Sequence, residues 1–160
     1  MLVKEMITQI RDQLHDITEE YSDDVLIKYI NTGIKSASYI LAQHNSSQLL
    51  KEITVNDGDD RPSDLLHFAG VYPLEIQDNK IRLYDEYNTP LTLRYFASKE
   101  NVSKPEDELP FSDEGVLIYI EQYASILAGN RNEFNEQQDT GLAQALRDEL
   151  LANTQIEQWN

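Results

Sequence analysis

One stretch of the sequence restricts the possible folds more than any other: residues 22–44, "SDDVLIKYINTGIKSASYILAQH". Its apolar residues recur at spacings of three and four, the pattern of an amphipathic helix with one buried face. This stripe consists of Val25, Leu26, Tyr29, Ile30, Ile34, Ala37, Ile40 and Leu41. Ser22 is a favoured N-cap residue. A rise of about 1.5 Å per residue gives a helix about 30 Å long, enough to form the spine of a domain.

Gly33 stands in the middle of this expected helix, where glycine costs about 1 kcal/mol relative to alanine. Ala37 lies four residues further on and therefore on the same face. Ser36 and Ser38 add further small side chains nearby. The cluster predicts that another helix, or a neighbouring subunit, approaches this side closely.

Three further helices are expected, over residues 2–15, 113–128 and 132–152, from the same type of apolar periodicity. Ser112 is the expected N-cap of the third helix. Between the second and third helices, at about residues 48–97, the period changes to the alternation of β-strands. The expected strands are "LKEITV", "IRLY", "TPLTLRYFA" and, interrupted by Pro73, "VYPLEI".

This order of elements predicts an α+β fold that is mainly α-helical. We expect a bundle of about four helices, two of them long and antiparallel, with a small antiparallel β-sheet or hairpin region inserted. Residues 1–152 are expected to form a single domain, and residues 153–160 a polar C-terminal tail. Pro62 and Ser63 favour one short helical turn. The polar connection at 98–115 is expected to be mobile or to contact a partner.

The charge balance is the strongest property of the composition as a whole. The chain has 29 acidic and 13 basic residues, and its formal net charge is −16. Such a surface repels phosphate backbones, which disfavours direct DNA or RNA binding. The simplest interpretation is solubility. The more specific one is a surface that lies near nucleic acid without binding it, or that meets a basic partner.

The sequence offers little that indicates catalysis. The histidines, His15, His44 and His67, lie far apart and in no metal-binding spacing. The stretch "DGDDRPSD" resembles a calcium-binding loop, but Arg61 and Pro62 occupy positions that require an oxygen ligand and glycine. The chain has no cysteine, which excludes disulfides and thiolate zinc sites. We therefore expect no enzyme activity, no cofactor and no metal.

No run of about 18 apolar residues occurs, so the sequence predicts no membrane-spanning helix. The charged N-terminus is not expected to be a secretory signal.

The pattern "YSDDVLIKYINTGIKSASYIL" resembles the opening helix of head–tail connector (adaptor) proteins of tailed bacteriophages. In that family an acidic cap precedes a leucine, a Tyr/Ile-Asn pair and small residues. The matching residues here are Asp23, Asp24, Leu26, Tyr29, Ile30, Asn31 and Ala37. Two later segments of the family are similar to "DDRPSDLLHFAGVY" and "FSDEGVLIYIEQYASILAG" here. An acidic residue near the start of the family's final helix resembles Asp139. The resemblance covers most of residues 20–150.

The resemblance implies a non-enzymatic structural protein of the virion that has no cofactor. Such proteins form rings, usually of twelve copies, beneath the portal and extend the DNA channel after packaging. The implied partners are the portal protein, further copies of the chain and tail or other neck components, with DNA passing through unbound and no membrane involved. The implied location is the neck of the virion, and the host cytoplasm during assembly.

The family resemblance also implies roles for individual residues. The C-terminal segment of these proteins reaches out to the portal or to a neighbour, and here it would be residues 153–160, with Ile156 and Trp159 as anchors and Asn160 at its end. For Gly33 and Ala37 two interpretations stay open, a tight crossing with the helix at 114–128 or a contact with the next subunit of a ring. The insertion at 48–97 is larger than in the shorter connectors.

Two other functions are compatible with the sequence. An acidic inhibitor that mimics DNA, or a small cytoplasmic regulator, would also carry a strongly negative charge. A small hydrolase is the third hypothesis, although its catalytic constellation is missing.

Overall fold

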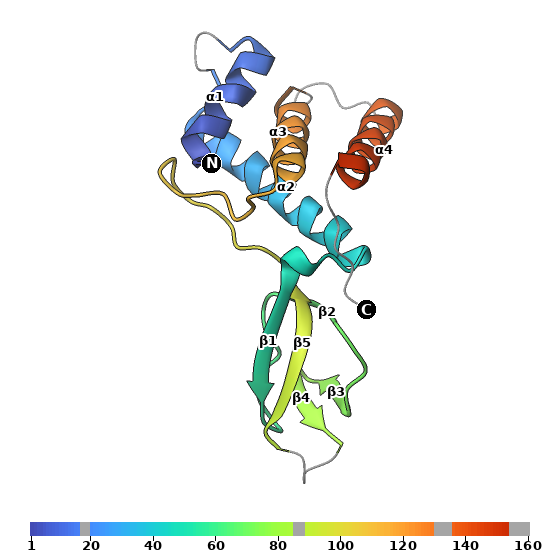
Figure 1. Cartoon of the computed structure of the whole chain (residues 1–160). Helices are drawn as coiled ribbons and strands as arrows, with labels where there is room; N and C mark the ends of the chain where they lie inside the picture. Colours follow the sequence, from blue (N-terminus) through green and yellow to red (C-terminus); the bar gives the residue numbers. More distant parts are fainter. Residues whose placement is uncertain (17–19, 85–88, 130–135, 154–160) are drawn as a thin grey trace. The chain divides into compact units, whose positions relative to one another are not determined.

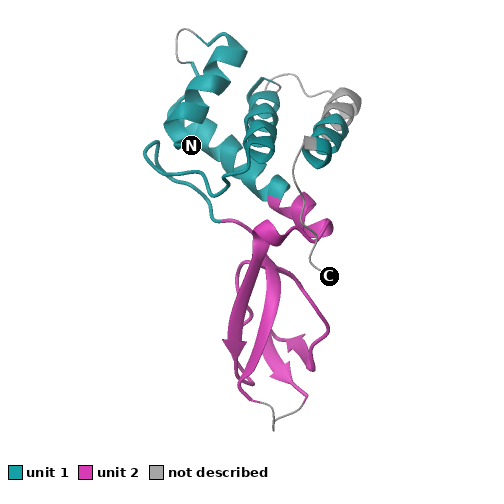
Figure 2. Ribbon diagram, viewed as in Figure 1, with its two compact units in different colours: residues 1–37, 100–155 teal, residues 38–99, 156–160 magenta. Residues whose placement is uncertain are grey.

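The computed structural model describes residues 1–16, 20–84, 89–129 and 136–153, and in the last helix it describes side chains from Gln144 onward. Two helices are followed by the strands and then by two further helices (Figure 1). The described residues divide into two compact units, which Figure 2 shows in different colours. Unit 1 contains residues 1–37 and those from 100 onward, and unit 2 contains residues 38–99.

Unit 1 is helical. It contains α1 (Val3–Leu14), most of α2 (Asp23–Gln43), α3 (Glu114–Gly129) and α4 (Glu136–Asn153). Helix α3 packs against both α1 and α4. The apolar stripes of all four helices contribute to its core, which includes Val3, Met6, Ile10, Leu26, Ile30, Ile34, Val116, Ile120, Ala124, Leu146 and Leu150. The predicted buried face of α2 is confirmed, because Leu26, Ile30 and Ile34 are fully buried.

Side chains at the helix starts satisfy backbone N–H groups that have no partner within the helix. At α2, the backbone N–H of Val25 donates to Ser22 Oγ at 3.3 Å, as the sequence predicts. At α3 the prediction of Ser112 as the cap is wrong. Asp113 Oδ1 accepts from the N–H groups of Gly115 at 2.8 Å and Val116 at 3.3 Å. A carboxylate also suits the positive end of the helix dipole.

The polar connection before α3 is held against the helices of unit 1. Its apolar residues Val102, Leu109 and Phe111 are buried. Its backbone also pairs with the start of the chain: Val3 N donates to Asp107 O, and Leu109 N to Met1 O, both at 2.9 Å. The expectation of a mobile segment therefore does not hold between residues 100 and 113, because widely spaced apolar side chains anchor it.

Unit 2 contains two antiparallel sheets. Strands β1 (Leu50–Val55), β5 (Leu91–Ala97) and β2 (Leu65–Phe68) form the first sheet in that order, and β3 (Leu74–Gln77) pairs with β4 (Lys80–Leu83) in the second. A short 3₁₀ turn at Ser47–Leu49 leads into β1. The turn between β3 and β4 has positive φ at both Asp78 and Asn79. This is the twist that a two-residue hairpin requires.

Unit 2 has an apolar core of its own. The alternating side chains of β1 and β5 face it, together with residues from β2, β3 and β4; its buried members are Val55, Leu65, Ile81, Leu83, Leu93, Tyr95 and Ala97. On the opposite face of the first sheet, two of the cross-strand pairs between β1 and β5 are polar. Thr54 and Thr92 hydroxyls lie 3.1 Å apart, and Arg94 Nε donates to Glu52 at 2.9 Å.

The prediction of a mainly helical bundle is wrong. The described structure has four helices and five strands, and the strands form two antiparallel sheets. The strands bury enough apolar surface among themselves to form a separate compact unit, whereas the sequence interpretation treats them as an insertion in a helical domain. Pro62 and Ser63 open a single hydrogen-bonded turn, in which Leu65 N donates to the Pro62 carbonyl at 3.2 Å, and β2 begins at Leu65.

Candidate functional site

Gly33 lies where α2 crosses α3. A Cβ atom added to it would lie 3.2 Å from Ile120 Cγ2 and 3.3 Å from the Ile120 carbonyl oxygen. The second distance involves backbone, which cannot move aside as a side chain can. The absence of a side chain at this position therefore allows the two helices to approach this closely, at the expense of helix propensity.

Ala37, one turn after Gly33, is fully buried. Ser36 lies beside it, and its hydroxyl is 2.7 Å from the hydroxyl of Tyr119 on α3. The ring of Tyr119 stacks on that of Tyr123, with centroids 5.7 Å apart. The small side chain of Ser36 on α2 thus faces Tyr119 on α3, and its hydrogen bond satisfies the buried tyrosine hydroxyl.

Asn31 performs a structural task that the sequence alone does not reveal. Its side-chain Nδ2 donates to the carbonyl of Val102, and the N–H of Val102 donates to Asn31 Oδ1, both at 2.8 Å. The side-chain amide therefore mimics a strand partner for the connection before α3. No periodicity could have predicted this contact, because the two residues lie far apart in the chain.

Replacement of Asn31 by alanine is expected to lower the free energy of unfolding by about 2 kcal/mol, because two half-buried backbone groups lose their partners. Asn101→Ala is the matched control, since Asn101 is exposed in the same connection. We expect that control to change stability by less than about 0.5 kcal/mol. Urea unfolding of both variants measures the difference, and equal stabilities would contradict the role of the Asn31 amide.

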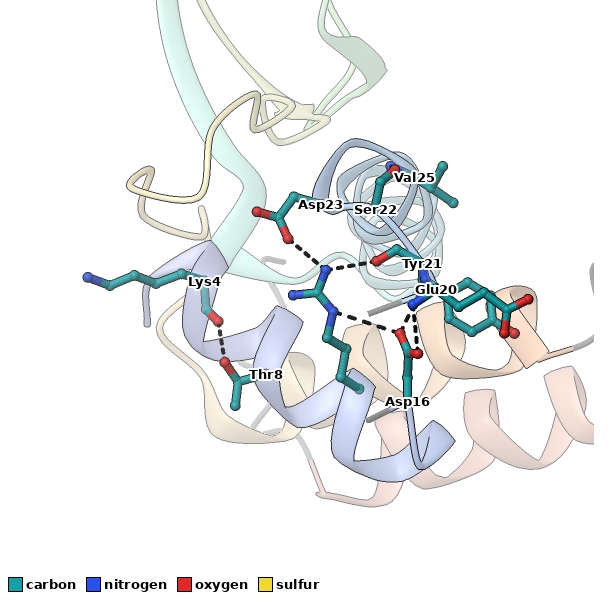
Figure 3. Close-up of polar contacts among 9 residues, drawn as sticks. Lys4, Thr8, Asp16, Glu20, Tyr21, Ser22, Asp23 and Val25 are labelled. Carbon is teal, nitrogen blue, oxygen red and sulfur yellow. Dashed lines mark hydrogen bonds and ion pairs between the residues drawn. The ribbon is translucent and has the colours of Figure 1, made fainter. Parts of the chain in front are cut away.

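A second polar cluster joins the end of α1 to the start of α2 (Figure 3). Arg11 Nη2 donates to the carbonyl of Tyr21 and to Asp23 Oδ1, both at 2.8 Å. The nearly buried Asp16 carboxylate accepts from the backbone N–H groups of Glu20 at 2.9 Å and Tyr21 at 3.2 Å. Arg11 and Asp16 bind backbone groups of this connection, and Arg11 also pairs with Asp23, so the cluster stabilises the join between the two helices.

Unit 2 contains a comparable structural cluster around Asp64. Its carboxylate accepts from Lys51 Nζ at 2.6 Å and from the Tyr95 hydroxyl at 3.0 Å. Burial raises the pKa of the Asp64 carboxyl, but these two hydrogen bonds, the positive charge of Lys51 and a backbone hydrogen bond together lower it more, so the net shift is downward. Burial and the Asp64 charge raise the pKa of Tyr95 to about 12. Near neutral pH the pair consists of a carboxylate and a neutral phenol, so Asp64 is not a proton donor there.

The loop resembling a calcium site uses its carboxylates for internal contacts. Asp57 Oδ1 accepts from Leu83 N at 2.9 Å, Asp59 accepts from Asn56 N at 2.7 Å, and Asp60 pairs with Lys80. Among the described residues, no group of three or more histidine or acidic side chains could hold a metal ion.

The histidines do not meet within the described units. His67 Nε2 lies 3.2 Å from the side-chain oxygen of Asn45, and its ring lies 4.7 Å from that of Phe96. His15 ends α1 in a left-handed conformation. His44 follows directly after α2.

A shallow groove between α3 and α4 is the surface feature of unit 1 that sequence analysis does not predict. It is lined by Gly115, Ile118, Tyr119 and Gln122 of α3 and by Leu146, Glu149 and Leu150 of α4. Ile118 is 45% exposed at its edge. Ile118 lies within an apolar helix sequence, but the structure leaves it outside the core of unit 1.

Of the sequence-predicted partner residues, Ile156, Trp159 and Asn160 lie outside the described residues. No protein-family model matches the chain, and no curated protein matches it with significant similarity. Among the described helices, none is both long and apolar enough to span a membrane.

Proposed function

We propose that this chain is a head–tail connector, or adaptor, protein of a tailed bacteriophage. In this proposal it is a structural, non-enzymatic protein that forms a ring under the portal, extends the DNA channel and docks tail components. The observation that carries the proposal is the sequence pattern of α2, from Asp23 and Asp24 through Tyr29, Ile30 and Asn31. Within this pattern, Asn31 holds Val102 in the connection before α3 through two hydrogen bonds.

The charge of the chain supports the same function. A ring multiplies the net charge of −16 per subunit, and the resulting field repels phosphate. A channel lined in this way lets DNA pass without retaining it. The proposed partners are the portal protein, neighbouring copies of the chain and tail or neck proteins, and the proposed location is the neck of the virion.

Negative-stain imaging of the purified protein mixed with the portal protein of the same virus tests the proposal. We expect ring density on the portal, and no such density would contradict the connector function. The same charge also suits an acidic DNA mimic, which predicts instead a soluble complex with a DNA-binding enzyme. A pull-down from infected cells would recover that enzyme rather than the portal if the alternative were correct.

Removal of the residues after Asn153 is expected to reduce portal occupancy at least about tenfold, because anchor residues such as tryptophan supply much of the binding energy at an interface. Leu150, a buried residue of α4, remains in this truncated chain, so we expect an unchanged thermal melt. Circular dichroism provides this control. Equal portal binding by the truncated and full-length chains would show that the C-terminal segment is not the docking element.

A further inference from the structure

Helix α2 carries an unusual distribution of charge. After Asp23 and Asp24 in its first turn, α2 contains two lysines and no further acidic residue, although the chain has 29 acidic residues in total. Lys28, Thr32, Lys35 and Tyr39 are all exposed and recur at spacings of three and four, so they form one stripe along the helix. Tyr39 is 49% exposed. We call these four residues the basic stripe.

The basic stripe lies opposite the buried face of α2. At about 100° of rotation per residue, Lys28, Thr32 and Lys35 lie on the far side of the helix from Leu26, Ile30 and Ile34. Gly33 also turns toward α3 of the same subunit. No ion pair joins Lys28 or Lys35 to another described residue. Two exposed ammonium groups and a large exposed tyrosine are therefore available for contact with another molecule.

The groove between α3 and α4 has the complementary chemistry. Ile118, Leu146 and Leu150 give it apolar walls, and Glu149 lines its edge. Glu114 is exposed at the start of α3, next to Gly115, which also lines the groove. No ion pair engages Glu114 or Glu149 within the described part of the chain. The nearby Arg147 already interacts within the chain. We call this feature the acidic groove.

We propose that the basic stripe on α2 of one subunit docks into the acidic groove between α3 and α4 of the next copy of the chain. The two surfaces differ, so the contact is heterologous, and such contacts generate a ring when the rotation closes. This inference rests on the proposed ring function and names the residues that would build the ring.

Charge explains why this one orientation is preferred. Copies that each carry a net charge of −16 repel one another over most of their surfaces. A contact that brings lysines to glutamates reduces this repulsion, and complementary charges mainly determine orientation and suppress incorrect pairings. Burial of Tyr39 and Ile118 supplies the apolar area, which contributes more of the affinity than exposed ion pairs do.

The chain contains no cysteine, so pairs of single-cysteine variants can test the contact directly. Thr32→Cys protein is mixed with size-tagged Ile118→Cys protein and oxidised, and the cross-linked heterodimer is quantified by gel. Val71→Cys replaces Thr32→Cys in the matched control, because Val71 is fully exposed in unit 2. A disulfide needs Cα atoms within about 7 Å, so we expect at least tenfold more heterodimer from the first pair.

Reversal of charge tests whether ion pairs contribute to the contact between copies. We expect about tenfold less cross-linked heterodimer when Lys28→Glu and Lys35→Glu are both added to the Thr32→Cys chain, because like charges then face each other. Glu114→Lys with Glu149→Lys in the Ile118→Cys chain is expected to restore it. The four charge-reversed residues, Lys28, Lys35, Glu114 and Glu149, are all exposed. Thermal melts verify that each variant is folded.

Native mass spectrometry of the same mixtures distinguishes the possible failures. Oligomers without the Thr32–Ile118 cross-link would overturn this interface and leave the ring function standing. A chain that forms neither oligomers nor the cross-link, in solution or on the portal, would contradict both the interface and the ring function. A charge-dependent cross-link without rings on the portal would support the interface while contradicting the connector function. A further outcome would also overturn the proposal: the chain binds a short DNA duplex, the Lys28→Glu and Lys35→Glu substitutions abolish that binding, and no cross-link between copies forms.

Discussion

Ile30→Asp is expected to unfold unit 1 or to reduce its stability by about 4 kcal/mol, because an unpaired charge would be buried in its core. Ile30 has no exposed surface in the structure. It lies on the apolar stripe of α2, between Leu26 and Ile34, which are also fully buried. Domains of this size are stable by only about 5–15 kcal/mol, so the loss is a large fraction of the total.

Thr32→Asp is the matched control for this prediction. It introduces the same side chain two residues further along α2, at an exposed position. We expect a change of less than about 0.5 kcal/mol there. Urea denaturation followed by circular dichroism measures both variants. A normal unfolding midpoint for Ile30→Asp would mean that the buried face of α2 is assigned incorrectly.

Gly33→Leu is the second large effect, with an expected loss of about 3 kcal/mol from overpacking. The first added carbon alone would lie 3.2 Å from Ile120 Cγ2 and 3.3 Å from the Ile120 carbonyl oxygen. Leucine adds three further carbons in the same direction, so the helices must separate or the side chain must adopt a strained rotamer. Gly33→Ala is expected to change stability little, because about 1 kcal/mol of gained helix propensity offsets the close contact.

Thr32→Leu is the control, since it adds a similar side chain at the adjacent exposed position. Thermal unfolding of the three variants gives the comparison. If Gly33→Leu melts like the parent protein, the crossing of α2 and α3 is not as close as the distances indicate. A Gly33→Leu protein that folds normally as a monomer but forms no rings would favour the alternative in which Gly33 faces a neighbouring subunit.

Local sequence signals predicted much of the secondary structure. The stripe of α2 is confirmed by its fully buried residues, and the alternation in "LKEITV" corresponds to β1. These predictions succeed because they depend on periodicity and on residues within one turn or one strand. The short strand β2 was harder to recognise, because Leu65–Phe68 is held by pairing with β5, far along the chain, and its register shifts between Leu65 and His67.

The sequence by itself determined the negative charge, the amphipathic face of α2 and the need for a close neighbour at Gly33. Composition and periodicity are properties of the chain at short range, so they can be read before it folds. Only the tertiary structure decided that the strands form a separate unit, that Asn31 holds Val102, and that Ile118 stays exposed beside Leu146 and Leu150. Each of these outcomes depends on contacts between segments that are distant in the sequence. Such contacts form only in the folded chain, where these segments share the same apolar surface and hydrogen-bond partners.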